Sequence, residues 1–222
     1  GSKRIKILYS KLKIRNLKDL KKAAEKQKIR NLEGFGYLSE QEILEGIKGL
    51  ESTKSRLLLG YMYPIAKEIE SKLITQKFIN KVTIAGSMRR MKETIHDVDI
   101  LVTTNDPKKT IDFFTSLSKK KLLAKGSTKA SIILYNGLQV DIRVLDNNHY
   151  GSGLNYFTGS KEHGIKLRNL AIKKGLKLSE YGIFKGKKTI ASKTELDIYK
   201  TLGLQYIEPE LREDTGEIES AL

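Results

Sequence analysis

Two segments near the middle of the chain alternate apolar and polar residues, and aspartates occupy the polar face of both. Residues 97–102 place Asp97 and Asp99 on one face of a strand, while the intervening apolar residues point into a core. Residues 137–144 repeat the alternation, with Asp141 opposite the apolar face. This period of two predicts two strands of a sheet with one buried face, so any fold for this chain has to contain that sheet.

A glycine and two arginines lie just before the first of these strands. Residues 86–90, Gly-Ser-Met-Arg-Arg, follow a short β-branched run that predicts a strand over 81–85. Gly86 allows the backbone to approach a ligand closely, Ser87 adds a hydroxyl, and Arg90 offers paired donors for phosphate oxygens. The segment therefore predicts a phosphate-binding loop. The alternative is that Arg90 forms a salt bridge with a neighbouring aspartate.

The three aspartates together are suited to binding metal ions. Carboxylate oxygens are ligands for Mg²⁺, which proteins usually hold with one or two carboxylates plus substrate phosphates. Three carboxylates on neighbouring strands can hold two metal ions about 3.5–4 Å apart, as nucleotidyl transfer requires. We therefore predict a catalytic site for two Mg²⁺ ions at Asp97, Asp99 and Asp141, with Mn²⁺ as the alternative ion. A structural calcium site, or a merely exposed pair of aspartates, is the competing interpretation.

Basic residues dominate the chain, which carries a net charge of +16 over 222 residues. The excess is uneven, because residues 1–30 carry +10 and residues 161–188 carry +7, whereas residues 189–222 carry −5. Two basic segments on either side of a carboxylate-bearing centre predict an electrostatic track for nucleic acid. The alternative is that these lysines only form a solvated surface.

Two absences from the sequence limit the class of protein. The chain has no cysteine, which excludes disulfides, thiolate catalysis and cysteine-ligated zinc. It also has no apolar run of about 18 residues, so no membrane segment is expected. We expect an intracellular protein, and a monomer is the default.

The patterns change twice along the chain and predict an α+β fold. Residues 1–75 carry apolar residues at helical spacing, interrupted by Gly-Phe-Gly at 34–36. This interruption resembles the hairpin of helix-hairpin-helix modules, whose backbone amides bind DNA phosphates, so Gly34 and Gly36 are candidate DNA contacts. The alternative is an ordinary tight turn. Residues 80–145 favour strands with one helix. After residue 148 the chain is punctuated by glycines, and helices are then expected over 160–174 and 194–202 with two short strands between them.

Two adjacent aromatic residues precede a glycine in the sequence Tyr-Phe-Thr-Gly-Ser at 156–160. Tyr156 and Phe157 are suited to contact with a sugar, while the glycine leaves the backbone exposed. They are equally suited to a core position before a helix that Ser160 caps. Both interpretations stand on the residues alone.

Taken together, these segments resemble the family X DNA polymerases, the group that contains polymerase beta and its bacterial and archaeal relatives. The matching segments occur in the family's order and rough spacing: Gly86-Ser87-x-Arg89-Arg90, Asp97-x-Asp99, Val140-Asp141-Ile142-Arg143, Tyr156-Phe157-Thr158-Gly159-Ser160 and Leu176–Phe184. The resemblance implies a nucleotidyltransferase-type mixed sheet, the palm, between an N-terminal helical DNA-binding subdomain and a C-terminal α/β subdomain for nucleotide selection. We expect helical subdomain, palm, C-terminal subdomain and acidic tail at residues 1–78, 79–147, 148–207 and 208–222.

The resemblance also implies a DNA-directed DNA polymerase of the prokaryotic cytoplasm that adds a dNTP to a primer in short-gap repair. Asp97 and Asp99 would hold both metal ions, and Asp141 would hold the catalytic ion and help to deprotonate the primer 3′-hydroxyl. The residues implied in nucleotide binding are Gly86, Ser87, Arg90, Tyr156, Phe157, Gly159 and Lys161. The residues implied in DNA binding, besides the hairpin, are Arg168 and Tyr181.

The sequence departs from the family pattern at two positions. Gly164 stands where many members carry an asparagine that contacts the incoming base, and Lys161 stands where polymerase beta has an acidic residue. Weaker base selection is therefore a hypothesis. Neither an N-terminal lyase module nor a C-terminal phosphoesterase domain is recognised in the sequence. We therefore expect a polymerase core, with residues 208–222 as a loosely packed extension.

Two other functions remain open. A template-independent nucleotidyltransferase would use the same loop and aspartates, but it would need neither the basic segments nor the aromatic pair. A non-catalytic nucleic-acid-binding module would need only the basic segments, and the three intact aspartates argue against it.

Overall fold

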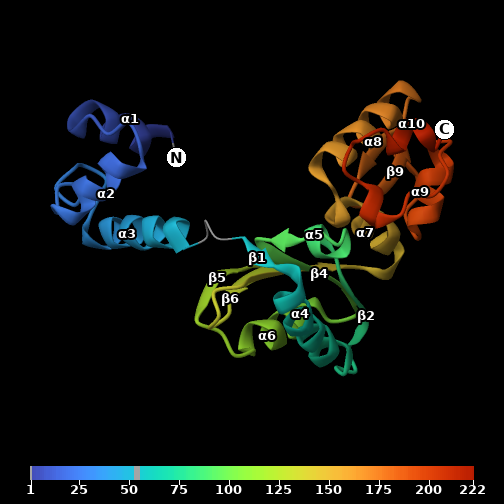
Figure 1. The fold of residues 1–222 in the computed structure, drawn as a ribbon, viewed down its shortest axis with the longest axis horizontal. Coiled ribbons are helices and arrows are strands. Elements are labelled where there is room, and N and C mark those ends of the chain that lie inside the picture. Colours follow the sequence, from blue (N-terminus) through green and yellow to red (C-terminus); the bar gives the residue numbers. More distant parts are fainter. Residues whose placement is uncertain (1, 53–55) are drawn as a thin grey trace. The chain divides into compact units, whose positions relative to one another are not determined.

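The computed structural model describes residues 2–52 and 56–222. The chain divides into two compact units, residues 1–55 and 56–222 (Figure 1). The first unit is helical. Its helices are α1 (Ser2–Leu12), α2 (Leu17–Glu25) and α3 (Tyr37–Ser52).

The loop between α2 and α3 contains the Gly-Phe-Gly sequence and is held by a buried glutamate. Glu40, in the first turn of α3, accepts hydrogen bonds from the backbone amides of Ile29 (3.0 Å) and Arg30 (2.9 Å). Gly34 has a positive φ of 76°, a conformation that favours glycine. The predicted turn is therefore present, and a buried carboxylate fixes the chain that enters it.

The second unit is built on a five-stranded sheet with the strand order β2-β4-β7-β6-β5. Its strands are β2 (Ile79–Ile84), β4 (Asp97–Thr104), β5 (Lys121–Lys125), β6 (Lys129–Ile133) and β7 (Gln139–Leu145). β4 and β7 are parallel neighbours, and the other pairs are antiparallel. The sheet is therefore mixed, as expected, and its two central strands carry the predicted aspartates.

Each face of the sheet packs against a different set of helices. α4 (Leu59–Ile74) and α6 (Pro107–Ser116) contribute Ile69 and Phe114 to the main core on one face. α7 (Tyr150–Thr158) covers part of the other face, where Leu101 of β4 packs with Leu154 of α7. The aspartates lie on this second face, beyond the region that α7 covers.

The remaining residues of the second unit form a smaller subdomain around its own core. Its elements are α8 (Lys161–Lys173), β8 (Lys177–Ser179), β9 (Gly182–Lys185), β10 (Lys188–Ala191) and α9 (Glu195–Thr201), followed by the 3₁₀ helix η2 (Pro209–Leu211) and α10 (Glu217–Ser220). The three strands form an antiparallel sheet. Shorter elements of the unit are β1 (Leu57–Leu58), α5 (Gly86–Arg89), β3 (Thr94–Ile95) and the 3₁₀ helix η1 (Asn147–His149).

The division between the units differs from the boundary expected after residue 78. Helix α4 belongs to the unit that contains the sheet, because its apolar residues Ala66, Ile69 and Leu73 are buried in the same core as the strands. The first unit therefore ends near residue 55.

The expectation of a loosely packed tail at residues 208–222 is wrong. Arg212 is fully buried, and Ile218 and Ala221 are part of the core of the C-terminal subdomain. Paired charges and these apolar contacts hold the segment in place. No helix among the described residues is long and apolar enough to cross a membrane.

Candidate active site

The register of the two central strands places the predicted aspartates side by side. Asp99 of β4 is paired directly with Asp141 of β7 in the parallel ladder, and Asp97 lies two residues before Asp99. Val98 and Val140, which alternate with the aspartates, are fully buried in the main core. The carboxylates therefore lie on the opposite face of the sheet, as the alternation predicts.

The electrostatics of these carboxylates favour a bound cation. Burial, and next the negative charges of Asp97 and Asp141, raise the pKa of Asp99 to about 7. Burial and the charge of Asp141 also raise the pKa of Asp97. The guanidinium groups of Arg90 and Arg143 act in the opposite direction on Asp99 but do not compensate. A divalent cation among these oxygens would relieve the repulsion and hold the carboxylates ionised.

The donor set fits Mg²⁺ in chemical type, but the side chains do not converge on one point as they stand. Asp141 is held by a hydrogen bond from Ser131 Oγ and by Gln139 Nε2, which lies 3.2 and 2.9 Å from its two oxygens. Within residues 2–52 and 56–222, no group of three His, Asp or Glu side chains is arranged to hold a metal ion.

The glycine loop packs directly against the aspartates. β2 ends at Ile84, and α5 begins at Gly86, which has a positive φ of 61°. A Cβ atom at Gly86 would lie 2.1 Å from Oδ2 of Asp99, so only glycine fits without displacing the carboxylate. The backbone at Gly86 therefore lies close to an oxygen of Asp99, and its close approach to a ligand stays a prediction.

The two adjacent arginines have different partners. Arg89 makes two hydrogen bonds to the buried carboxylate of Glu195, at 3.0 and 2.7 Å. Arg90 donates from Nε to Glu213 (2.8 Å) and from NH1 to the carbonyl oxygen of Thr158 (2.5 Å). The ion pair of Arg90 is thus with Glu213 in the tail, and not with Asp97 or Asp99 as the alternative interpretation supposed.

A single cavity of about 370 Å³ brings together all seven of the predicted nucleotide-binding residues. Its lining includes Gly86, Ser87, Arg90, Asp97, Asp99, Tyr156, Phe157, Gly159, Lys161, Gly164 and Arg168. Asp141 lies in an adjoining cavity of about 230 Å³, which shares Asp99 and Phe157 with the first. The loop, the aspartates and the aromatic pair therefore surround one connected region.

The aromatic pair lies in the last turn of α7 at the edge of this cavity. Tyr156 is 45% exposed and meets the Phe157 ring edge to face, at 5.1 Å between centroids. The guanidinium carbon of Arg168 lies 6.0 Å from the Tyr156 ring, and that of Arg143 lies 5.1 Å from the Phe157 ring. The exposure of Tyr156 at a cavity that also holds Arg90, Asp97 and Asp99 fits ligand contact better than a core position.

The remaining predicted contacts lie outside the cavity. Tyr181 lines a separate hollow of about 200 Å³ together with Arg143, and its ring meets that of His149 at 5.7 Å. Gly34 and Gly36 belong to the first unit, where they form the loop described above. The roles of these three residues stay predictions.

The charged residues that hold Arg89 and Arg90 in place could not be predicted from the sequence. Glu195, Arg212 and Glu213 are single charged residues in an acidic segment, without a distinguishing pattern. A partial signal existed for Glu195, because it follows Thr194, which caps α9. Only the tertiary structure shows that Glu195 of α9 contacts Arg89 and that Glu213 of the tail contacts Arg90.

Comparison with known proteins gives a consistent family. A family model described as the DNA polymerase beta thumb matches residues 153–213. A DNA polymerase/3′-5′ exonuclease of Bacillus subtilis is 37% identical over 227 residues, covering 99% of this chain and 40% of the relative. A repair DNA polymerase X of African swine fever virus is 25% identical over 179 residues, covering 77% of this chain and 98% of the relative.

The fold is also that of a solved family member. The structure of Leishmania infantum polymerase beta in a ternary gap complex has a TM-score of 0.75 at 20% identity, with 96% of this chain and 86% of that chain covered. The chain spans less than half the length of the Bacillus relative. On the matches to the thumb model, the curated polymerases and this fold, the chain belongs to the family X DNA polymerases.

Proposed function

We propose that this chain is a DNA-directed DNA polymerase, which transfers a nucleotide from a dNTP to a primer 3′-hydroxyl on primer-template or gapped DNA. The observation that carries the proposal is the cavity of about 370 Å³ lined by Gly86, Ser87 and Arg90 on one side and by Asp97 and Asp99 on another. A phosphate-binding loop against paired carboxylates is what nucleotidyl transfer needs. The family assignment supports the same activity.

The cavity offers separate groups for the parts of a nucleotide. In this proposal, Ser87, Arg90 and the backbone at Gly86 bind the triphosphate. Tyr156 and Phe157 contact the sugar beside Gly159, which has a positive φ of 70° and lines the same cavity. Lys161, exposed at the start of α8, adds a positive charge on the cavity rim.

The three aspartates would hold two Mg²⁺ ions, or Mn²⁺ in their place. When bound, such ions neutralise the charge that develops on the attacking and leaving oxygens of an in-line displacement. The raised pKa of Asp99 indicates that this face of the sheet favours a positive charge or a proton. Asp141, which lines the adjoining cavity and is hydrogen-bonded by Ser131 and Gln139, would accept the proton of the primer hydroxyl.

DNA would be bound mainly through its phosphates. Net charges of +10 over residues 1–30 and +7 over residues 161–188 supply attraction that is independent of base sequence. Gly34 and Gly36 would contact the backbone of the duplex, and Arg168 and Tyr181 would contact the template or the nascent base pair. The similar Leishmania polymerase beta was solved as a ternary gap complex, which supports a gapped substrate for this chain. We expect the chain to act as a monomer.

The test is primer extension on a one-nucleotide gap with Mg²⁺, comparing Asp141→Ala with Asp112→Ala as a matched control. Asp112 is an exposed residue of α6 that pairs with Lys125 on the surface, away from the cavity. Incorporation that survives in Asp112→Ala and is abolished in Asp141→Ala is expected. Addition without a template would place the protein among terminal transferases, and DNA binding with no incorporation under Mg²⁺ or Mn²⁺ would indicate a binding module.

A further inference from the structure

The C-terminal tail contacts the phosphate-binding loop through residues that do not line the cavity. Glu213 Oε1 accepts a hydrogen bond from Arg90 Nε at 2.8 Å, and Nζ of Lys92 lies 3.5 Å from the same oxygen. One residue earlier, the carbonyl oxygen of Arg212 accepts a hydrogen bond from the Ser160 amide at 3.0 Å. Residues 212 and 213 thus contact both the arginine of the loop and the segment that follows the aromatic pair.

Arg90 is held on two sides by these contacts. Its Nε donates to the Glu213 carboxylate and its NH1 to the Thr158 carbonyl oxygen, so that two of five donors are engaged within the protein. Its side chain is 13% exposed and lines the cavity. A guanidinium group bonded at two of its nitrogens has a fixed plane, and the donors left on NH1 and NH2 are then available to a ligand in a fixed direction.

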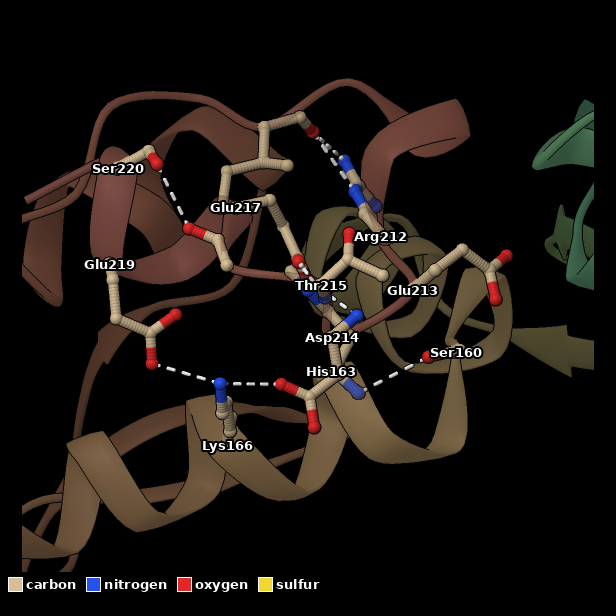
Figure 2. A network of polar contacts seen from close by, with 12 residues as sticks. Ser160, His163, Lys166, Arg212, Glu213, Asp214, Thr215, Glu217, Glu219 and Ser220 are labelled. Carbon is tan, nitrogen blue, oxygen red and sulfur yellow. Dashed lines mark hydrogen bonds and ion pairs between the residues drawn. The ribbon is translucent and has the colours of Figure 1, made fainter.

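The tail that carries Glu213 is anchored independently of Arg90. Figure 2 shows Lys166 of α8 between Asp214 (2.5 Å) and Glu219 (2.9 Å). Glu217 accepts hydrogen bonds from the amides of Asp214 (2.9 Å) and Thr215 (2.7 Å). Loss of the Glu213 carboxylate would therefore release Nε of Arg90 and leave the side chain held only through NH1 to Thr158, while the tail stays in place.

We propose that Glu213 is a positioning residue of the nucleotide site, which orients Arg90 for the triphosphate of an incoming dNTP. This inference rests on the proposed function. An arginine that is already oriented loses less side-chain freedom when it binds phosphate. The carboxylate also partly neutralises Arg90, so the site recognises the geometry of the phosphate more than its charge alone. The opposite role, a carboxylate that competes with phosphate for Arg90, predicts tighter binding after its removal.

The test is calorimetric titration of the full chain with a dNTP in the presence of Mg²⁺. Glu213→Ala is expected to raise the Kd about two- to twelvefold, which corresponds to about 0.5–1.5 kcal/mol for one side chain that becomes ordered only on binding. Glu213→Gln keeps an acceptor oxygen at the same reach and is expected to show a smaller increase. In turnover, KM for the dNTP should rise while kcat changes little, because the lost interaction is one of binding. Glu210→Ala, an exposed glutamate of the same tail, is the matched control.

A second readout tests the contact without any ligand. The Nε–H resonance of Arg90 in the free protein should exchange with water faster in Glu213→Ala than in wild type or Glu210→Ala. Unchanged exchange, or a dNTP Kd equal to that of Glu210→Ala, would overturn the positioning role. Tighter dNTP binding in both Glu213 variants would establish competition in its place. A wild-type protein that binds no dNTP at all would instead refute the proposed function.

Discussion

Replacing Glu195 by glutamine should destabilise the second unit substantially, because one buried carboxylate neutralises two arginines. The Glu195 side chain is 6% exposed and receives hydrogen bonds from Arg89 (3.0 and 2.7 Å) and Arg212 (2.6 Å), and from the Tyr206 hydroxyl (3.1 Å). Burial alone would raise its pKa, but the hydrogen bonds from Arg89 and the charge of Arg212 lower it. The carboxylate is therefore ionised and fully engaged.

The size of the expected loss of stability follows from the burial of Arg89 and Arg212, the two partners of Glu195. Removing one member of a buried ion pair costs about 3–5 kcal/mol, because a buried charge is left without compensation. Glutamine keeps one acceptor oxygen, so the lower limit of about 3 kcal/mol is the better expectation. For a unit of this size, about 3 kcal/mol corresponds to a Tm lower by about 6–12 °C.

Thermal and urea unfolding followed by circular dichroism measure this effect directly. Glu162→Gln, at an exposed glutamate in the first turn of α8, is the matched control and should change Tm by less than about 1 °C. Adding Arg89→Met removes one of the uncompensated charges, so the double variant should lose about 1–3 kcal/mol less than the sum of the single variants. A loss below about 1 kcal/mol for Glu195→Gln, or strict additivity in the double variant, would refute the assigned role.

Three further predictions concern the cavity and the tail. Gly86→Ala should lower the incorporation rate by about 10²-fold, since its Cβ would lie 2.1 Å from Asp99 Oδ2 and displace it; a single-turnover rate near wild type would contradict this. Burial lowers the pKa of His163 below its ordinary 6.5, so the unfolded chain binds its proton more readily and stability falls as pH drops below about 6.5. His163→Gln should remove that part of the slope between pH 7 and 5 in urea titrations. A slope of stability against pH that is unchanged in His163→Gln would refute the role of His163. Glu217 does not contribute to this slope: hydrogen bonds from His163 and the tail amides outweigh its burial and lower its pKa to about 2, so its contribution to stability is lost only below about pH 4.5. Gly164→Asn should fold normally, because a Cβ there meets only Arg168 NH1, at 3.6 Å. It should reduce misinsertion, because asparagine at this position is the residue that the family resemblance assigns to contact with the incoming base. Equal misinsertion rates for the variant and the wild type in steady-state assays would contradict the hypothesis of weak base selection.

The central strands could be predicted because their pattern is local. Residues buried on one face of β4 alternate with Asp97 and Asp99, and a period of two leaves little choice of orientation. The loop residues Gly86, Ser87 and Arg90 could be proposed, like the aspartates, because they belong to short segments with their own chemistry. Family resemblance added Arg168 and Tyr181, and the structure places only Arg168 in the cavity.

Helix α7 was not predicted, because it contains two glycines, which have low helix propensity. Gly151 and Gly153 lower the helix propensity of residues 150–158, so the sequence favours a loop there. In the structure, a Cβ at Gly151 would lie 2.3 Å from the backbone of Thr194, and one at Gly153 would lie 2.1 Å from the Leu145 side chain. Both glycines allow close packing of α7, and this tertiary contact outweighs the local preference.

Strand β5 and the tail were missed for other reasons. All five residues of β5 are exposed, so no buried face imposes a period of two on its sequence. The tail looks disordered in sequence because it is acidic, yet its acids pair with cations that are distant in the chain, as Glu213 does with Arg90. Such pairs become visible only when the two segments are placed together.

Templated synthesis is tested most directly by changing the template base opposite a one-nucleotide gap. Each of the four templates would be offered each dNTP separately with Mg²⁺, and single-turnover incorporation would be measured. A DNA-directed polymerase is expected to change its preferred nucleotide with the template and always to insert the complement. The same preference on all four templates, or equal incorporation in the absence of a template, would contradict this function.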